Sequence, residues 1–567
     1  MKVNPDLAME RAKCNFNIME RQHAHIIDHR STPRTLKSNF LLCIPFPFAE
    51  DIALNSGASK DSFPEEHMSP KEKINSGVIR RTADAFFKEV SPFLLHMGMF
   101  VPTIMGQCTS EQMSYWLPRA MDMQIIGTYA QTELGHGTFI RGLETTATYD
   151  PETEEFVLHS PTLSSYKWWA GGLGNTANYC IVVAQLYTKG ECHGTHPFIV
   201  QIRDEDTHMP LPGITVGEIG PKMGFNTADN GFLGFDHYRI PRDHMMMKNA
   251  QVLKDGTYVK VARHGKLTYG TMVAPEPQIL DYATQQHKLF ITIATAHALQ
   301  LSSTWLWQSF SAVLREMKDG NTDKLPEFHA LSSCLKAVST SDAAYLIEQC
   351  RHACGGHGYM ISSGIPHLYN FVSATRTYEG DYTVLLLQTA RFLVKAYEQA
   401  EANQPLTPTV SYLKLAFSRK EPWDSSPAGI AHCRAVISDA YRSEIVRLTA
   451  NASPNVKIVM EQLSTLYLYY WALERTGDLL LYTSMSEKDI VELQLAYEEQ
   501  LQKIRPNAVG IVEAFDLRDE LLHSTLGSYD GQAYERLMDE ALRSPMNKEP
   551  VNQAYYKYLR PMMKSNL

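Results

Sequence analysis

The chain has 567 residues, of which 53 are Lys or Arg and 62 are Asp or Glu, so its formal net charge is -9. This length predicts several domains, and a hydrophobic content of 44% is typical of an ordinary globular protein. Both signs of charge are mixed along the chain, which argues against nucleic acid as a main partner. No apolar stretch is long enough to span a bilayer, and the first residues do not resemble a signal peptide. The nine cysteines are scattered and odd in number, which indicates reduced thiols rather than a disulfide framework.

The first part of the chain, residues 1–124, is mostly helical by pattern, and we predict an N-terminal helical domain there. Apolar residues recur at helical spacing over residues 80–97. A further helix is predicted over residues 109–121, with Thr109 or Ser110 able to cap its start.

The pattern changes over residues 125–256. The segments 157–158, 179–184 and 198–202 are rich in β-branched residues and are separated by Gly, Asn, Pro and Asp, as strands and turns are. We therefore predict a β domain here, between helical ones.

Helical patterns return in two further parts, residues 257–400 and residues 401–567, with a seam rich in Pro and Ser over residues 405–427. Helices are predicted over residues 279–317, 330–354 and 382–399. The predicted fold class is α+β and mainly α, with an N-terminal helical domain, a middle β domain and two C-terminal helical-bundle domains.

One carboxylate, that of Glu379, lies between an aromatic residue and a glycine in the tract Arg376-Thr377-Tyr378-Glu379-Gly380. The apolar residues that follow predict that it is poorly solvated, which is the condition for a general base with a raised pKa. The glycine would let a flat cofactor or a thioester approach closely. The alternative is a capping turn at the start of a helix.

Two other tracts carry glycines beside groups that can meet a flat ring. The first runs from Tyr129 to Thr138 and has two glycines in one loop, so its backbone N–H groups can bind a heterocycle or an oxyanion. The second runs from Lys167 to Gly174 and joins two indoles to a glycine-rich turn, and indoles stack on planar rings. The alternative for each tract is a glycine-rich β-turn with a tryptophan in the core.

In this order, the three tracts together resemble the acyl-CoA dehydrogenase and acyl-CoA oxidase superfamily, most closely the peroxisomal acyl-CoA oxidases. The dehydrogenases end the Thr-Glu loop with Gly-Ser-Asp, whereas this chain has Gly137-Thr138-Phe139, which is similar to the oxidase branch. Further matches are residues 149–153, 220–224, 229–231, 238–242, 354–359 and 529–531. The resemblance covers nearly the whole chain.

The resemblance implies FAD-dependent oxidation of a fatty acyl-CoA to a trans-2-enoyl-CoA. Molecular oxygen would then be reduced to hydrogen peroxide, in the first step of peroxisomal fatty acid β-oxidation. Glu379 matches the base that takes the α-proton, and in the superfamily the backbone N–H of this glutamate and a flavin ribityl hydroxyl hold the thioester carbonyl. Thr132 and Gly171 match positions that contact FAD, and Gly355 and Gly356 are further cofactor candidates. Trp168 and Trp169 either wall the flavin or pack the β domain.

The same resemblance implies a homodimer and, with the end of the chain, a peroxisomal import receptor as a partner. A peroxisomal address consists of a small residue, a basic residue and leucine. Ser565 and Leu567 match it, whereas Asn566 replaces the basic residue and Lys564 lies directly upstream. The tail alone fits a chance match equally well, and the oxidase-like body makes the peroxisome the expected compartment.

Cys350, His352, Cys354 and His357 have a spacing that loosely resembles a set of zinc ligands. A structural zinc site usually takes a second pair of ligands at a distance, and no other cysteines make a clean pair. We therefore predict no metal site, and the resemblance makes residues 354–359 a superfamily turn near the adenosine part of the flavin.

The chain departs from the oxidases in two places. A long helix that normally follows the position of Met272 is missing, and a second shortening lies near residues 411–436. Three hypotheses therefore stay open: an active acyl-CoA oxidase, an acyl-CoA dehydrogenase, and an inactive acyl-CoA-binding or dimerising partner of a full-length oxidase. The loop from Gly135 to Thr138 argues against the dehydrogenase, and the missing helix favours the inactive partner.

Overall fold

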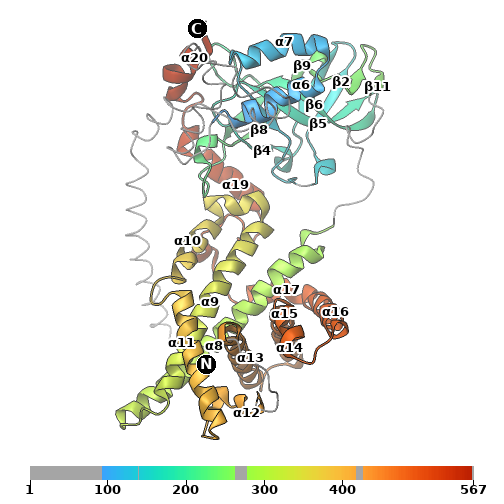
Figure 1. Cartoon of the computed structure of the whole chain (residues 1–567). Helices are drawn as coiled ribbons and strands as arrows, with labels where there is room; N and C mark the ends of the chain where they lie inside the picture. Colours follow the sequence, from blue (N-terminus) through green and yellow to red (C-terminus); the bar gives the residue numbers. More distant parts are fainter. Residues whose placement is uncertain (1–91, 138, 262–276, 417–424, 565–567) are drawn as a thin grey trace, which may run out of the picture. The chain divides into compact units, whose positions relative to one another are not determined.

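The computed structural model describes residues 92–137, 139–261, 277–416 and 425–564, and these residues form a mainly α-helical protein with β-sheets (Figure 1). Two compact units make up the chain. The first comprises Met1–Gly220, Gly224–Val273 and Leu537–Leu567, and the second comprises Pro221–Met223 and Ala274–Arg536. The fold class predicted from the sequence, α+β and mainly α, is confirmed.

The larger sheet of the first unit has six strands. They are β1 (Gly127–Ala130), β2 (Thr146–Asp150), β3 (Glu155–His159), β5 (Tyr179–Thr188), β6 (Glu191–Gln201) and β9 (Tyr238–Pro241). The strand order is β1-β5-β2-β3-β9, and β6 pairs with β5 as an antiparallel hairpin. Both β1 and β2 run parallel to β5, with Gly127 opposite Tyr179 and Thr146 opposite Gln185. Nine of the ten residues of β5 are buried, so its sequence is a nearly continuous apolar run.

A second sheet has the order β4-β8-β7, and all its pairs are antiparallel. Its strands are β4 (Lys167–Ala170), β7 (Ile214–Glu218) and β8 (Gly231–Phe235), and a separate pair is formed by β10 (Ala250–Val252) and β11 (Tyr258–Lys260). One buried cluster joins side chains of the two sheets, among them Phe156, Phe198 and Leu233. The predicted strands at residues 157–158 and 179–184 lie in β3 and β5. The predicted strand at residues 198–202 matches the end of β6 and extends one residue beyond it.

Two α-helices and a short π-helical segment flank the larger sheet (Figure 1). They are η2 (His96–Phe100), α6 (Val101–Gln107) and α7 (Ser110–Met121). Thr109 caps α7 in a reciprocal capping box with Gln112, as the sequence predicts. The helix buries Trp116 against Tyr179 of β5, at 5.5 Å between ring centroids. Most of the helix predicted over residues 80–97 lies outside the described residues.

The end of the chain belongs to the first unit. After α19 (Ala533–Leu542) come η13 (Pro545–Asn547), η14 (Tyr555–Leu559) and α20 (Arg560–Lys564). The amide of Asn547 donates to the carbonyl oxygen of Glu218 and accepts from its N–H, each at 2.8 Å. Tyr555 stacks on His208 at 4.1 Å between ring centroids. Four structural parts were predicted from the sequence, and that division stays a prediction.

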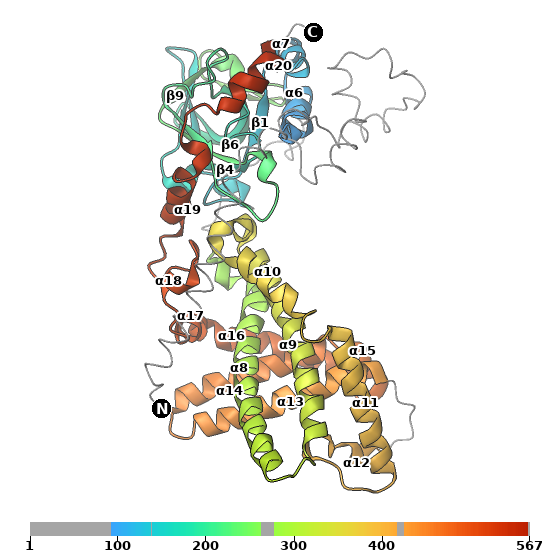
Figure 2. The same cartoon turned by 90° about the vertical axis from the view of Figure 1, so that its left-hand side faces the viewer.

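Helices make up the second unit (Figure 2). They are α8 (Ala283–Lys318), α9 (Leu325–Ala353), α10 (Ile365–Thr375), α11 (Tyr382–Glu401), α12 (Leu413–Ala416), α13 (Ser425–Leu448), α14 (Pro454–Leu473), α15 (Thr476–Tyr482), α16 (Glu487–Ile504), α17 (Ala508–Glu513) and α18 (Asp519–Leu522). Helices α8 and α9 run side by side, and α13 and α14 pack across α8. The helices predicted over 279–317, 330–354 and 382–399 correspond to α8, α9 and α11. None of the helices in the described ranges is both long and apolar enough to cross a membrane.

A buried ion pair ties three of these helices together. Arg434 of α13 donates to both carboxylate oxygens of Asp342 of α9, with 2.7 Å between Nη2 and Oδ1. Its guanidinium lies 3.4 Å from the ring centroid of Trp471 of α14, and Nη1 also donates to the Tyr467 hydroxyl. Only 4% of Asp342 is exposed, so water could solvate its carboxylate only poorly if the ion pair were broken.

We expect Asp342→Asn to lower the free energy of unfolding of the helical unit by about 3 kcal/mol, because it leaves the Arg434 guanidinium without its counter-charge. Asp439→Asn, the same change at an exposed position of α13, is the control and should cost less than about 0.5 kcal/mol. Urea unfolding followed by far-UV circular dichroism measures both. Equal midpoints for the two variants would contradict a stabilising role for the pair.

Candidate active site

The loop that carries Thr132 leaves β1 and runs along the segment that leads into β4. The backbone N–H of Trp168 donates to the Thr132 carbonyl oxygen at 2.9 Å, and the backbone N–H of Leu134 donates to the Tyr166 carbonyl oxygen at 2.8 Å. The Thr128 hydroxyl donates to the carbonyl oxygen of Gly171 at 2.7 Å. The structure therefore brings the loops of Thr132 and Gly171, two of the predicted cofactor residues, side by side in the first unit.

A fully buried carboxylate, that of Glu133, lies beneath the Thr132 loop. Its Oε1 accepts from the Lys167 ammonium at 2.8 Å and from the Thr145 hydroxyl at 2.6 Å. The backbone N–H groups of Glu144 and Thr145 add two more hydrogen bonds, at 2.8 and 3.0 Å. The carboxylate is thus well paired although no part of the side chain reaches solvent.

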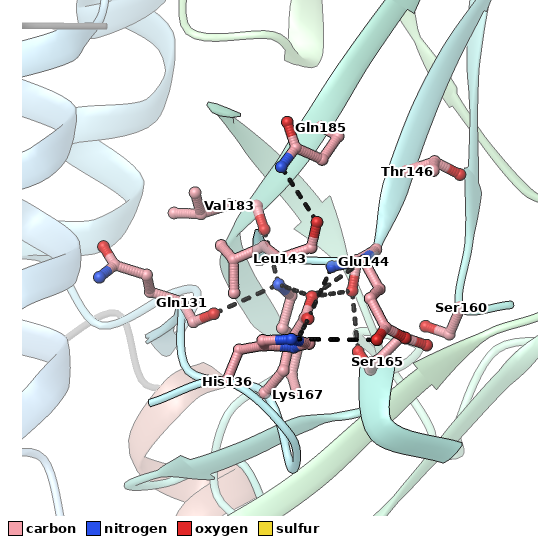
Figure 3. Close-up of polar contacts among 12 residues, drawn as sticks. Gln131, His136, Leu143, Glu144, Thr146, Ser160, Ser165, Lys167, Val183 and Gln185 are labelled. Carbon is pink, nitrogen blue, oxygen red and sulfur yellow. Dashed lines mark hydrogen bonds and ion pairs between the residues drawn. The ribbon is translucent and has the colours of Figure 1, made fainter. Parts of the chain in front are cut away.

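The ammonium of Lys167 is equally buried and equally well paired (Figure 3). Besides Glu133 it donates to the carbonyl oxygen of Val183 in β5 at 2.7 Å and to that of Gln131 at 3.3 Å. One side chain from β4 therefore binds the Thr132 loop and the central strand of the larger sheet together.

The carboxylate of Glu133 is ionised at neutral pH. Burial alone would raise the pKa of Glu133, but the Lys167 charge and hydrogen bonds from His136, Lys167 and Thr145 outweigh it and lower that pKa to about 2. Burial lowers the pKa of Lys167, and the Glu133 charge opposes this effect. His136 extends the network, with Nδ1 at 3.4 Å from Glu133 Oε2.

The structure separates the roles of the two neighbouring tryptophans. Trp168 is buried and stacks on Phe232 of β8, with 5.9 Å between ring centroids, so it belongs to the core. A register shift lies between Trp168 and Ala170, and Trp169 has a φ of +80°. Trp169 is only half-buried. The sequence did not decide whether either indole walls the flavin or packs the β domain. In the fold, Trp169 is the one of the two that can contact a flat ligand.

Gly171 is buried, and packing explains why it has no side chain. A Cβ at this position would lie 3.2 Å from the Ala228 carbonyl oxygen and 3.4 Å from Leu95. At Gly172 the φ of +77° favours glycine, and its N–H donates to the same Ala228 oxygen at 2.6 Å. The glycine run is therefore needed for the fold of this loop, whatever it binds.

Two charged side chains to which the sequence analysis gave no role hold this loop. The buried Arg203 guanidinium donates to the carbonyl oxygens of Leu173, Gly174 and Ala177, at 2.6 to 3.2 Å. Asp229 accepts from the backbone N–H groups of Asn175 and Thr176 at 2.7 and 2.8 Å. Burial lowers the pKa of Arg203 to about 10, and Asp229 opposes the shift. Asp229 lies in the segment 229–231 that matches the family, whereas no neighbouring residue in the sequence marks Arg203 as functional.

Glu379 lies in the second unit, in the turn between α10 and α11. Its φ is +54° and that of Gly380 is +110°, so both residues are in the left-handed region. The cap of α11 is Asp381, whose carboxylate accepts from the N–H groups of Thr383 and Val384 at 2.9 and 3.4 Å. The capping turn is thus real, but Glu379 is not the capping residue.

The predicted poor solvation of Glu379 is wrong for the described structure, in which this residue is exposed. The apolar residues that follow it form α11, which buries Leu393 and Ala396 two or more turns further on and leaves Val384 and Leu387 exposed. Neighbouring apolar residues in the sequence therefore do not cover the carboxylate.

Gly355 and Gly356 are exposed in η9 (Gly355–Tyr359), directly after α9. A Cβ at Gly355 would meet open space, and its φ of +58° is the reason for a glycine. The Glu379 turn is bound to α9 at Lys336. A helix rises about 1.5 Å per residue, so Lys336 and Gly355 are on the order of 28 Å apart along the axis of α9. The structure therefore does not bring these glycines to Glu379 within the unit.

The cysteines and histidines at the end of α9 have local contacts. The Cys350 thiol lies 3.9 Å from the Thr292 hydroxyl, and His352 Nε2 lies 3.1 Å from Glu348 Oε1. Burial raises the pKa of the Cys350 and Cys354 thiols. Local packing thus accounts for Cys350 and His352 without a ligand.

Three family models match the chain. They are "Acyl-coenzyme A oxidase N-terminal" over residues 62–126, "Acyl-CoA oxidase, C-alpha1 domain" over residues 243–394 and "Acyl-CoA oxidase" over residues 392–564. Acyl-coenzyme A oxidase 1 of Drosophila melanogaster is 40% identical over 100% of this chain and 99% of its own length. This chain belongs to the acyl-CoA oxidase family. Peroxisomal acyl-coenzyme A oxidase 1 of Rattus norvegicus is 38% identical over 99% of each chain.

Solved acyl-CoA oxidases also align with this chain. Acyl-CoA oxidase 1 of Arabidopsis thaliana is 36% identical, with a TM-score of 0.49 over 83% of this chain and 85% of that one. Acyl-CoA oxidase-2 of Caenorhabditis elegans, bound with FAD, ascaroside-CoA and ATP, is 35% identical, with a TM-score of 0.48 over 91% and 93%.

This member of the acyl-CoA oxidase family is shorter than its relatives. The alignment with the Drosophila oxidase is 676 residues long and the chain has 567, so about 109 aligned positions (676 minus 567) have no counterpart here. The predicted shortenings after Met272 and near residues 411–436 would account for such a difference, and each includes residues outside the described ranges.

We expect Glu133→Gln to destabilise the first unit by about 3–5 kcal/mol at neutral pH, because it leaves the buried Lys167 ammonium unpaired. The native Glu133 pKa of about 2 lies below the ordinary 4.5, so its contribution is present above pH 4.5 and is lost as the pH falls towards 2. Between pH 3 and 7, the thermal unfolding midpoint of Glu133→Gln should therefore change less with pH than that of the wild-type protein. Glu152→Gln, at an exposed position, is the control, and the same pH dependence in both variants would contradict the assignment.

Proposed function

We propose that this chain is an FAD-dependent acyl-CoA oxidase that converts a fatty acyl-CoA to its trans-2-enoyl-CoA and reduces molecular oxygen to hydrogen peroxide. The observation that carries the proposal is the 40% identity to an acyl-coenzyme A oxidase over the whole chain, in a sequence that keeps Glu379. An oxidase of this kind acts in the first step of fatty acid β-oxidation.

In this proposal Glu379 takes the α-proton of the substrate. Its carboxylate is exposed on a turn whose backbone is tightly constrained, since a Cβ at Gly380 would lie 2.8 Å from Leu385. The substrate and the cofactor would then supply the desolvation that the unit itself does not provide, which favours proton transfer to a carboxylate. The Glu379 N–H would donate to the thioester oxygen as negative charge develops there.

The loops of the first unit fit a flavin. Trp169 presents a half-buried indole, the half-buried Thr132 accepts from the backbone N–H of the adjacent Trp168, and a Cβ at the exposed Gly137 would meet open space. We propose Thr132 and Gly171 as FAD-contacting positions, and Gly355 and Gly356 as weaker ones. When bound, FAD accepts the hydride from the substrate Cβ and passes the electrons to oxygen.

We also propose the peroxisome as the compartment, because the mammalian relatives carry this compartment in their names. The tail Ser565-Asn566-Leu567, which would meet an import receptor, lies outside the described residues. A homodimer, a β-barrel-like middle domain and the four-part division of the chain complete the proposal, and they rest on the family resemblance.

A second candidate is an inactive acyl-CoA-binding or dimerising partner of a full-length oxidase. The roughly 109 aligned positions that this chain lacks favour it, because the loss of a whole helix can remove cofactor contacts. The third reading, a dehydrogenase that passes electrons to another flavoprotein, is disfavoured by the oxidase-type loop at Gly137.

The visible spectrum of the purified protein distinguishes all three candidates. Palmitoyl-CoA is added without oxygen, and the sample is then opened to air. Flavin absorbance that bleaches and recovers in air supports the oxidase, and bleaching without prompt recovery supports the dehydrogenase. A folded protein that binds no flavin supports the inactive partner.

We expect Glu379→Gln to keep the fold and the flavin but to slow flavin reduction by palmitoyl-CoA by at least about 100-fold, because an amide cannot accept the α-proton. Glu398→Gln, at an exposed position of α11, is the matched control. Anaerobic stopped-flow absorbance measures the reduction rate. Wild-type reduction in Glu379→Gln would rule out Glu379 as the base.

A further inference from the structure

A lysine from the middle of α9 binds the turn that carries Glu379. The Lys336 ammonium donates to the carbonyl oxygen of Tyr378 at 2.9 Å and, at shorter range, to that of Gly380. These two carbonyl groups flank Glu379 in the chain. Lys336 is half-buried, and the resemblance to the oxidases gave it no role.

The turn needs such support because its backbone is strained. Glu379 has a side chain and yet a φ of +54°, a conformation that persists only where the surroundings enforce it. The Tyr382 N–H donates to the Arg376 carbonyl oxygen at 3.1 Å and closes the turn across its base. From the side of α9, Lys336 holds the 378–379 peptide, which carries the Glu379 N–H, and the 380–381 peptide.

The hydrogen bond to Tyr378 also sets the direction of a catalytic donor. In a trans peptide the C=O and N–H point in opposite directions, and the Tyr378 carbonyl shares its peptide with the Glu379 N–H. Because that carbonyl accepts from Lys336, the Glu379 N–H points away from the Lys336 ammonium. Among the described residues this N–H has no acceptor, so it is available to an oxygen of a ligand.

We propose that Lys336 is a positioning residue for Glu379, which orients both the Glu379 N–H and the carboxylate towards the substrate. The inference rests on the proposed function of Glu379 as the base. Lys336 acts through the backbone and does not touch the reacting atoms. Loss of the two hydrogen bonds would let the 378–379 and 380–381 peptides rotate, and small displacements of this kind reduce rates strongly.

The test compares Lys336→Met, Lys336→Arg and the control Lys395→Met, an exposed position of α11, in the full-length flavin-loaded protein. We expect Lys336→Met to reduce the flavin about 10- to 100-fold more slowly, with flavin content unchanged and KM changed less than about threefold. Lys336→Arg should recover part of the rate, since a guanidinium can donate to both carbonyls. An α-deuterated substrate should show a larger isotope effect in Lys336→Met, because proton removal becomes more rate-limiting.

A second readout is independent of turnover. Hydrogen–deuterium exchange of the peptide that spans residues 376–383 should become at least about tenfold faster in Lys336→Met and stay unchanged in Lys395→Met. Unchanged exchange, or a wild-type reduction rate together with an unchanged isotope effect, would overturn the proposal. If Lys336→Met loses flavin or fails to fold, Lys336→Gln, which has a shorter and uncharged side chain, decides: slower reduction and faster exchange support positioning, and wild-type values for both contradict it.

Failure of this inference is distinguishable from failure of the proposed function. If Glu379→Gln reduces flavin at the wild-type rate, Glu379 is not the base, and Lys336 then has no catalytic base to position. If Glu379→Gln is inactive while Lys336→Met behaves as wild type, the proposed function stands and only the positioning role is wrong.

Discussion

Two opposite charges with no solvent contact, Glu133 and Lys167, meet where the first candidate cofactor loop passes β4. An unpaired charge at this depth would be very unfavourable, so each must find the other and must fill its remaining hydrogen-bonding positions from the backbone. The carbonyl groups of Gln131 and Val183 and the N–H groups of Glu144 and Thr145 do so. That requirement holds the Thr132 loop, the segment just before β2, the strand β4 and the central strand β5 in one arrangement.

A similar arrangement holds two other segments that carry candidate functional residues. A cation from another part of the unit binds several carbonyl oxygens of the segment. Arg203, which follows β6, does so for the glycine loop after β4, and Lys336 of α9 does so for the turn that carries Glu379. Loops have few backbone partners of their own, and a multivalent donor supplies them from a rigid neighbour. Charged side chains therefore supply rigidity to segments that glycine leaves free to adopt unusual conformations.

Membership of the acyl-CoA oxidase family and the reduced length of the chain bear on function in opposite ways. The candidate base and the two candidate flavin loops are present, each with a local hydrogen-bond network. Roughly 109 aligned positions of the Drosophila relative are absent. Since the hydrogen bonds of all three networks lie within a single unit each, none of the three draws a described hydrogen bond from the missing segments. Cofactor affinity and assembly are the properties that a lost helix would affect.

The sequence by itself determined the local structure and the family. Period and capping residues placed α7, β5 and α11 correctly, because these signals depend on neighbours a few residues apart. The three glycine-bearing tracts and their order were enough to indicate the oxidases, and to single out Thr132, Gly171 and Glu379.

Tertiary structure alone decided which groups meet across long stretches of chain. The pairing of Glu133 with Lys167, the contact of Lys336 with the Glu379 turn and the packing of Asn547 against Glu218 join residues that no local pattern relates. It also decided between the two tryptophans, because a register shift in β4 buries one indole and leaves the next half-exposed. Exposure of Glu379 was missed for the same reason: solvation depends on which elements pack over a residue, and adjacent residues in the sequence do not specify that.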